Sequence, residues 1–124
     1  MCDIEHRVIG LHFFENHLNG YLNPDTFKNL VHLKYLNIFN DGRVYEMEEL
    51  PHKNTIWILD STVFSSLSNL EEINMNNLDM LGKIDAEFVS ALPNLKYLNL
   101  AHNQLSGELP NTELWAGMKK LSYI

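Results

Sequence analysis

The chain has 124 residues, of which 45% are hydrophobic, a formal net charge of −7 and a single cysteine, Cys2. This length and composition are typical of one globular domain. The negative charge disfavours nucleic acid as a partner, because binding a phosphate backbone needs clustered Lys and Arg side chains. One cysteine excludes an internal disulfide and a metal site built from cysteines, and the absence of an apolar run of about 18 residues argues against membrane insertion.

Apolar residues recur along the chain at an interval of about 25 residues. With Leu98 as the reference, the equivalent anchors are Leu11, Leu36, Ile73, Leu98 and Ile124. Neighbouring anchors are 25, 37, 25 and 26 residues apart, so one interval carries about a dozen extra residues. A second apolar column stands three residues earlier, at Val8, Leu33, Leu70, Leu95 and Leu121. This spacing fits neither a continuous amphipathic helix nor a simple two-faced strand, and it predicts stacked coils.

In chain order, the periodicity predicts four coils and the start of a fifth within a single domain, residues 1–124. Residues 8–32 form a strand, a turn at Asn16, and a helical turn before Phe27 that Asp25 or Thr26 is able to cap. Residues 33–69 contain an insertion at about 43–60. Residues 70–94 carry Leu78 where an asparagine is expected. Residues 95–120 are the best formed, and residues 121–124 begin a partial fifth coil.

The stretch from Leu92 to Pro110 reads L-x-x-L-x-x-L-x-L-x-x-N-x-L-x-G-x-L-P. This pattern resembles the leucine-rich repeat, in the variant found in plant receptor ectodomains, and residues 110–121 are also similar to repeats of kinetoplastid surface antigens. The resemblance implies an α/β fold: a right-handed leucine-rich-repeat solenoid of four to five coils. Its parallel β-sheet would form the concave face, with short helical turns and loops on the convex face.

Buried columns and inward-turned asparagines would hold such a solenoid together. Each coil alone cannot bury its apolar side, but stacked coils join the apolar columns into one core. We expect Asn16 and Asn103 to turn inward and to satisfy backbone groups at the tight bend, which is a structural role.

The residues between the leucines of each strand should face outward, because successive side chains of a strand point to opposite faces. One outward column comprises Glu15, Asn40, Asn77 and His102. Exposed aromatic side chains beside amides favour a protein-recognition surface. The candidate partner-binding residues are Tyr35, Asn37, Phe39, Glu72, Asn74, Tyr97, Asn99 and His102. The alternative is that these side chains only stabilise the sheet through cross-strand pairs, with the Asn column as an amide ladder.

The insertion is apolar from residue 56 to residue 59, with Trp57 in its middle. Two interpretations remain open for it. A loop of this kind can carry binding specificity, or its apolar half can fold over the open edge of the second coil.

No pattern of catalytic or metal-binding residues is present in the sequence. None of the six histidines has a cysteine or paired carboxylate at metal-ligand spacing, and no Gly-rich phosphate loop occurs. Glu71 and Glu72 are neighbours in a strand, so they point in different directions. We therefore expect no enzyme activity, no catalytic residue, no metal and no cofactor. The expected function is non-enzymatic recognition of a protein partner through the concave face. The alternative is a structural solenoid that forms homo-oligomers through its open C-terminal coil.

The compartment stays open. Cys2 followed by Arg7-Val8 resembles the junction between an N-terminal cap and the first coil in secreted members of the family. The sequence as written has no signal peptide and no Asn-x-Ser/Thr sequon. It is therefore compatible with a cytoplasmic protein or with a piece of a longer extracellular one.

Overall fold

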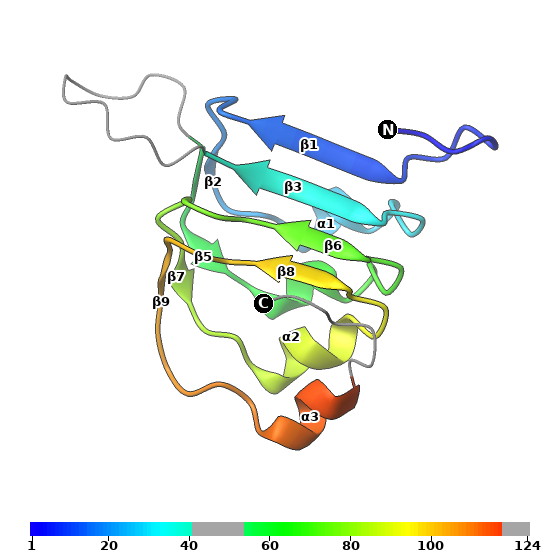
Figure 1. Cartoon of the computed structure of the whole chain (residues 1–124). Coiled ribbons are helices and arrows are strands. Elements are labelled where there is room, and N and C mark those ends of the chain that lie inside the picture. The colour runs from blue at the N-terminus through cyan, green and yellow to red at the C-terminus, as the bar shows by residue number, and fades with distance from the viewer. Residues whose placement is uncertain (41–53, 118–124) are drawn as a thin grey trace.

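The computed structural model describes residues 1–40 and 54–117 of the chain. Four strands, β1 (Gly10–Phe14), β3 (Tyr35–Phe39), β6 (Glu72–Asn74) and β8 (Tyr97–Asn99), form one parallel sheet in the order β1-β3-β6-β8, called the main sheet here. Figure 1 shows them side by side in chain order, all pointing the same way. The alternation of buried and less buried residues along them, such as buried Leu36 and Ile38 in β3, follows the two-residue period of a strand.

The predicted register of the apolar anchors is confirmed for the described residues. Leu11 pairs with Leu36, Leu36 with Ile73, and Ile73 with Leu98. The fifth anchor, Ile124, lies outside the described residues. Leu36, Ile73 and Leu98 are buried, and so are Leu33, Leu70 and Leu95 of the second column. Each such side chain removed from water contributes about 1.5–3 kcal/mol to folding.

Short parallel ladders follow the main sheet at the edge where its strands end. Strand β2 (Asn19–Gly20) pairs with β4 (Thr55–Ile56), and β5 (Ile58–Leu59), β7 (Leu81–Gly82) and β9 (Gln104–Leu105) form a second ladder (Figure 1). Gly82 has a φ of 119°, and a Cβ there would stand 3.0 Å from the carbonyl oxygen of Leu59. Close stacking of β5 on β7 therefore requires glycine at this position.

Four short helical elements alternate with the strands of the described chain, and the first three lead to β3, β6 and β8 in turn. They are α1 (Pro24–Phe27), the 3₁₀ helix η1 (Ser61–Phe64), α2 (Ala86–Ala91) and α3 (Thr112–Gly117), and each contacts the next. Their buried residues include Phe64 and Phe88, whose rings pack edge to face at 5.2 Å.

The cap of α1 is a correction to the sequence analysis. The side-chain oxygen of Asn23 accepts a hydrogen bond from the backbone N–H of Asp25 at 2.9 Å, so the cap is Asn23 and not Asp25 or Thr26. The helix begins at Pro24, so Asp25 and Thr26 lie inside it. Proline suits this first helical position because its missing N–H would have no intrahelical partner there.

Regular structure of the second coil, called the second repeat unit from here on, resumes before residue 60, where the expected insertion of about 43–60 would end. Residues 41–53 lie outside the described residues, but Asn54 is fully buried, and residues 55–59 belong to β4 and β5 with one residue between them. The side-chain oxygen of Asn54 accepts hydrogen bonds from the backbone N–H groups of Asn16 and Leu18. Asn103 accepts equivalent bonds from Leu78 and Met80. Asn54 is thus the inward asparagine of its unit. The repeat spacing predicts this role for position 41, and Asp41 lies outside the described residues.

Two other asparagines differ from their predicted roles. Asn16 is exposed, and among the described residues its side-chain amide donates only to the carbonyl oxygen of Phe14. The bend of the first unit is held by Asn54 of the next unit. Asn40, expected on the outward face, is buried and bonds the backbone N–H and carbonyl of Asn54 and the carbonyl of Asn77. Leu78 stands where the inward asparagine of the third unit is expected, and its side chain has no polar group to bond the backbone of the second unit. Asn40 supplies one such bond by accepting from the N–H of Asn54.

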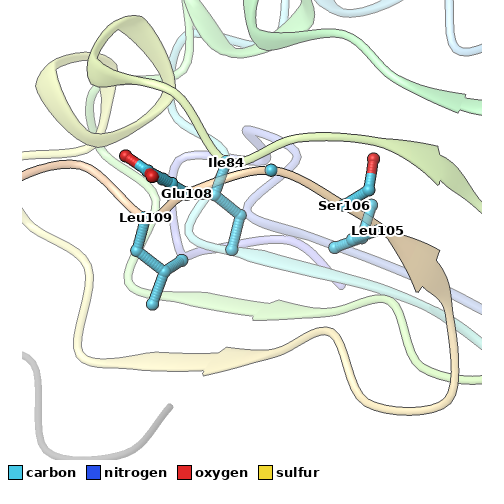
Figure 2. Close-up of a pocket in the computed structure, with 6 residues that line it drawn as sticks. Ile84, Leu105, Ser106, Glu108 and Leu109 are labelled. Carbon is cyan, nitrogen blue, oxygen red and sulfur yellow. The ribbon is translucent and has the colours of Figure 1, made fainter.

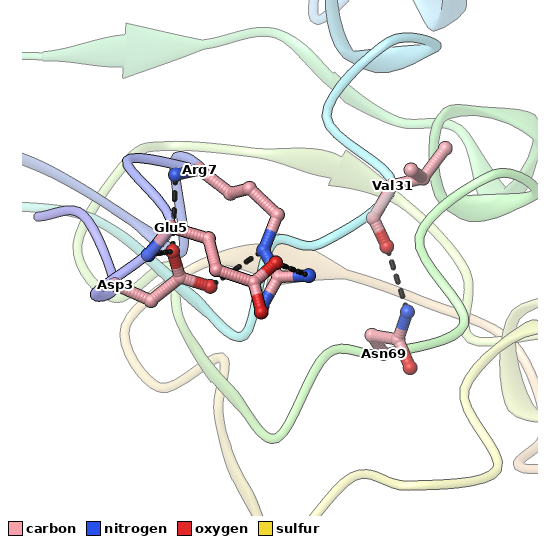
Figure 3. A network of polar contacts seen from close by, with 5 residues as sticks. All are labelled: Asp3, Glu5, Arg7, Val31 and Asn69. Carbon is pink, nitrogen blue, oxygen red and sulfur yellow. Dashed lines mark hydrogen bonds and ion pairs between the residues drawn. The ribbon is translucent and has the colours of Figure 1, made fainter.

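The N-terminal segment folds against β1 through polar contacts. Cys2 forms an isolated antiparallel bridge with Val8, and its thiol is free. Arg7 contacts the carboxylates of Asp3 and Glu5, each at 2.7 Å, as Figure 3 shows. The same view shows the amide of Asn69 donating to the carbonyl oxygen of Val31 at 2.7 Å, a bond between two successive units.

Candidate partner-binding surface

The outward face of the main sheet carries most of the predicted site residues in two rows that cross the strands. Tyr35, Glu72 and Tyr97 are paired in register in one row. Asn37, Asn74 and Asn99 form the other. All six alternate with buried residues of the same strands, so their side chains share one face.

Aromatic side chains gather at the end of this face nearest β1. The rings of Phe14 and Phe39 lie 5.2 Å apart, and His12 packs edge to face against Phe39 at 5.3 Å. Phe14 is exposed, and its residue pairs with Phe39 in the ladder. His12 and Phe14 are not among the candidate site residues predicted from the sequence. Their ladder positions beside Asn37 and Phe39 were the available signal.

A row of charges borders the rows of the site at the beginning of the strands. The Glu71 carboxylate contacts the Lys34 ammonium at 3.3 Å and also the Lys96 ammonium. The hydrogen bond from Lys96, and then that from Lys34, lowers the pKa of Glu71 below its ordinary value, against the opposing effect of partial burial. The same bond raises the pKa of Lys96. This alternation of charges is fixed by the sheet, because the three residues follow one another in the backbone ladder.

The asparagine row is not an amide ladder in the part of the chain that the structure describes. The side-chain oxygens of Asn37 and Asn74 are buried and receive no hydrogen bond from those residues. Asn99 differs, because its side-chain oxygen accepts a bond from the backbone N–H of Ala101 in its own turn. A buried acceptor without a donor costs about 1–3 kcal/mol, so these two oxygens have unused hydrogen-bonding capacity.

His102 is not brought into either row. It follows β8 by three residues, is exposed, and has a φ of 55°. Glu15 and Asn77 occupy the equivalent bend positions with φ of 48° and 55°. Three members of the column predicted from Glu15, Asn40, Asn77 and His102 therefore lie at a bend in left-handed conformation and not at an outward strand position. The fourth, Asn40, is buried.

A small cavity lies away from the main sheet. It measures about 130 Å³ and is lined by Ile84 and by residues 105–109, as Figure 2 shows. Leu109 is exposed at its border, and Glu108 is its charged lining residue. A space of this size holds only a few water-sized groups and carries no arrangement of reactive side chains.

Within residues 1–40 and 54–117, no group of three His, Cys, Asp or Glu side chains is placed to hold a metal ion. Over the same residues, no helix has both the length and the apolar composition needed to cross a membrane. The open C-terminal coil, to which the self-association alternative was assigned, falls on residues 118–124, outside the described part of the chain.

Comparison with known proteins gives one finding. Residues 51–105 match the model of the leucine rich repeat family, which spans the end of the second repeat unit, the third unit and the start of the fourth. No curated protein matches the chain.

Proposed function

Because this chain is a leucine-rich repeat protein, we propose that it is a non-enzymatic recognition module. It binds a partner protein through the outward face of the main sheet. Leucine-rich repeat domains commonly mediate protein–protein interaction and typically are not enzymes. The binding residues in this proposal are Tyr35, Asn37, Phe39, Glu72, Asn74, Tyr97, Asn99 and His102.

The observation that carries the proposal is the pair of unpartnered amide oxygens at Asn37 and Asn74. The two residues are adjacent in register, so their amides stand side by side across β3 and β6. Rotation of either amide toward a partner's N–H group would relieve the cost of a buried acceptor without a donor. A purely structural row would instead have bonded its amides to one another.

The neighbouring side chains fit the same role. Tyr35 and Tyr97 flank Glu72 on the face, and tyrosine combines a large apolar area with a hydroxyl group at low entropic cost. In this proposal the units stack as coils of a single domain of solenoid form, with the main sheet on the concave side.

The experiment starts by identifying partners of the intact chain by affinity capture and then measures binding to each purified partner. The double substitution Tyr35→Ala and Tyr97→Ala should weaken binding at least about tenfold, as loss of aromatic anchors does at other interfaces. Leu109→Ala is the control, because Leu109 is an exposed apolar residue outside the main sheet. Circular dichroism should be the same for all three proteins. Equal affinity of the double variant and the unmodified chain for every partner would refute the proposal.

The bend residue needs a different substitution. His102→Gly removes the imidazole and suits the left-handed backbone, whereas alanine would keep a Cβ atom in that unfavourable conformation. If His102 contacts the partner, His102→Gly should lower affinity while the free energy of unfolding stays equal or rises. An unchanged affinity would remove His102 from the site.

A further inference from the structure

The small ladders carry exposed apolar side chains that the main-sheet site does not use. The exposed fractions are 65% for Tyr21, 44% for Trp57, 45% for Ile58 and 52% for Leu81. We call these four residues the ladder patch. Single exposed apolar residues are common, but a contiguous group on a protein surface marks an interaction site.

The backbone holds the ladder patch together. The N–H of Trp57 donates to the carbonyl oxygen of Gly20 at 2.9 Å, and the N–H of Leu81 donates to that of Trp57 at 3.0 Å. Ile58 and Leu81 are directly paired between β5 and β7. The rings of Tyr21 and Trp57 meet edge to face at 5.1 Å. A partner therefore meets these side chains already ordered, which lowers the entropic cost of binding.

A cavity of about 400 Å³ opens beside the patch. It is lined by Tyr21, Leu22, Asn23, Pro24, Ile58 and Asp60. Two of its polar side chains already cap helical elements: the oxygen of Asn23 accepts from Asp25, and one carboxylate oxygen of Asp60 accepts from Thr62. The second carboxylate oxygen of Asp60 has no partner among the described residues. The cavity thus offers apolar walls and one negative charge.

We propose that the ladder patch and this cavity form a second binding site, which takes a short basic segment of another protein. An aliphatic or proline side chain of that segment fills the cavity against Tyr21, Pro24 and Ile58, and an adjacent Lys or Arg contacts the free oxygen of Asp60. The net charge of −7 favours a cationic partner, because it raises the rate of encounter. A glycan fits less well, since its hydroxyl groups need several polar partners, most of this lining is apolar, and the side-chain oxygen of Asn23 and one oxygen of Asp60 are already bonded.

The test pans a library of random octapeptides on the intact chain and then synthesises the enriched peptides. Enriched peptides should carry Lys or Arg next to Leu, Ile, Val or Pro. In fluorescence polarisation, Trp57→Ala should weaken their binding about tenfold or more. Asp60→Asn should weaken it about two- to fivefold at low salt and have little effect at 1 M salt, because an exposed ion pair is weak and screened. Asparagine keeps the cap of η1, so this substitution tests the charge alone.

Two controls separate this site from other effects. Asp85→Asn changes another capping carboxylate, the one that accepts from Phe88 at 2.8 Å, and should leave peptide binding unchanged. Tyr35→Ala in the main sheet should also leave it unchanged. If Trp57→Ala does not fold, Tyr21→Ala replaces it. The proposal would be overturned if the enriched peptides were neutral or acidic. It would also be overturned if neither Trp57→Ala nor Asp60→Asn changed their affinity. Binding of an oligosaccharide array that depends on Trp57 would replace it with glycan recognition.

Discussion

Asn54 and Asn103 occupy equivalent positions, and each joins two repeat units through its side-chain amide. Asn54 accepts from two backbone N–H groups of the first unit and donates to the carbonyl oxygens of Phe13 and Phe39. Asn54→Ala removes all of these bonds and leaves partly buried groups without partners. We expect its free energy of unfolding to fall by at least about 1–3 kcal/mol, the cost of one such group. Urea denaturation followed by circular dichroism measures this loss.

Asn16→Ala is the matched control at the same scale. Asn16 is exposed, and in the described part of the chain its side chain donates only to the nearby carbonyl of Phe14. Its removal should therefore change the free energy of unfolding by no more than about 0.5 kcal/mol, as at other surface positions. Equal denaturation midpoints for Asn16→Ala and Asn54→Ala would show that the buried side-chain amide of Asn54 does not stabilise the bend at residues 16–18.

Glu71 gives a pH-dependent prediction. The hydrogen bond from Lys96, then that from Lys34, lowers the pKa of Glu71 in the folded state below its ordinary value of 4.5. A lowered pKa stabilises the fold at pH values above the unfolded pKa, and this contribution disappears as the pH falls through the folded pKa. Glu71→Gln should therefore be less stable at pH 7 by about 0.2–1 kcal/mol, the range of solvent-screened ion pairs.

The difference between Glu71→Gln and the unmodified chain should shrink below pH 4.5 and also in 1 M salt at pH 7, because salt screens charges at the surface. Denaturation curves at pH 7 and pH 3 measure it. A difference that stays constant across this range would mean that Glu71 acts through packing and not through its charge.

Residue roles could be predicted from the sequence only where the repeat spacing is intact. The inward role of Asn103 follows from its position five residues after Leu98. The same count from Leu36 leads to Asp41, whereas the residue that performs the role is Asn54. The buried role of Asn40 could not be predicted for a different reason. Asn40 compensates for the missing asparagine at Leu78 of the next unit, and the sequence does not show that the two residues lie close together.

At the scale of elements, three helical turns begin with the same device. Asn23, Asp60 and Asp85 each accept a hydrogen bond from a backbone N–H group at the start of α1, η1 and α2. Asp85→Ala should lower the free energy of unfolding by about 1 kcal/mol, because it leaves an N–H group of α2 without a partner. Asp85→Asn should retain most of the stability. Thermal unfolding of the two variants decides this, and an equal loss in both would assign the effect to charge and not to capping.

The strands were easier to predict than the helical turns. Main-sheet strands have anchors every 25 or so residues, and their register follows because a slip would move every apolar side chain to the other face. The helical turns are four to six residues long, too short for a helical period to appear in the sequence. The rows of outward-facing residues could be predicted once the strands were known. The aromatic contact of Tyr21 with Trp57 could not, because no sequence periodicity indicates that these two segments pair.

At the scale of the whole molecule, each unit buries its apolar side against its neighbours, so position in the stack should set the cost of a substitution. Ile73 is fully buried in β6, between β3 and β8, whereas Leu11 is partly buried in β1, which pairs only with β3 among the described strands. Ile73→Ala should lower the free energy of unfolding by about 2–5 kcal/mol, and Leu11→Ala by clearly less.

Hydrogen exchange tests the same idea without substitution. The backbone amides of β6 should be protected more strongly than those of β1, because opening the end of a stack exposes less apolar surface than opening its middle. Ile73→Val is the control for shape and should cost only about 0.5–1.5 kcal/mol. Leu11→Ala and Ile73→Ala could instead lower the free energy of unfolding equally, with the amides of β1 protected as well as those of β6. In that case the chain would unfold in a single cooperative transition. Position in the stack of repeat units would then not determine how much a substitution destabilises the chain.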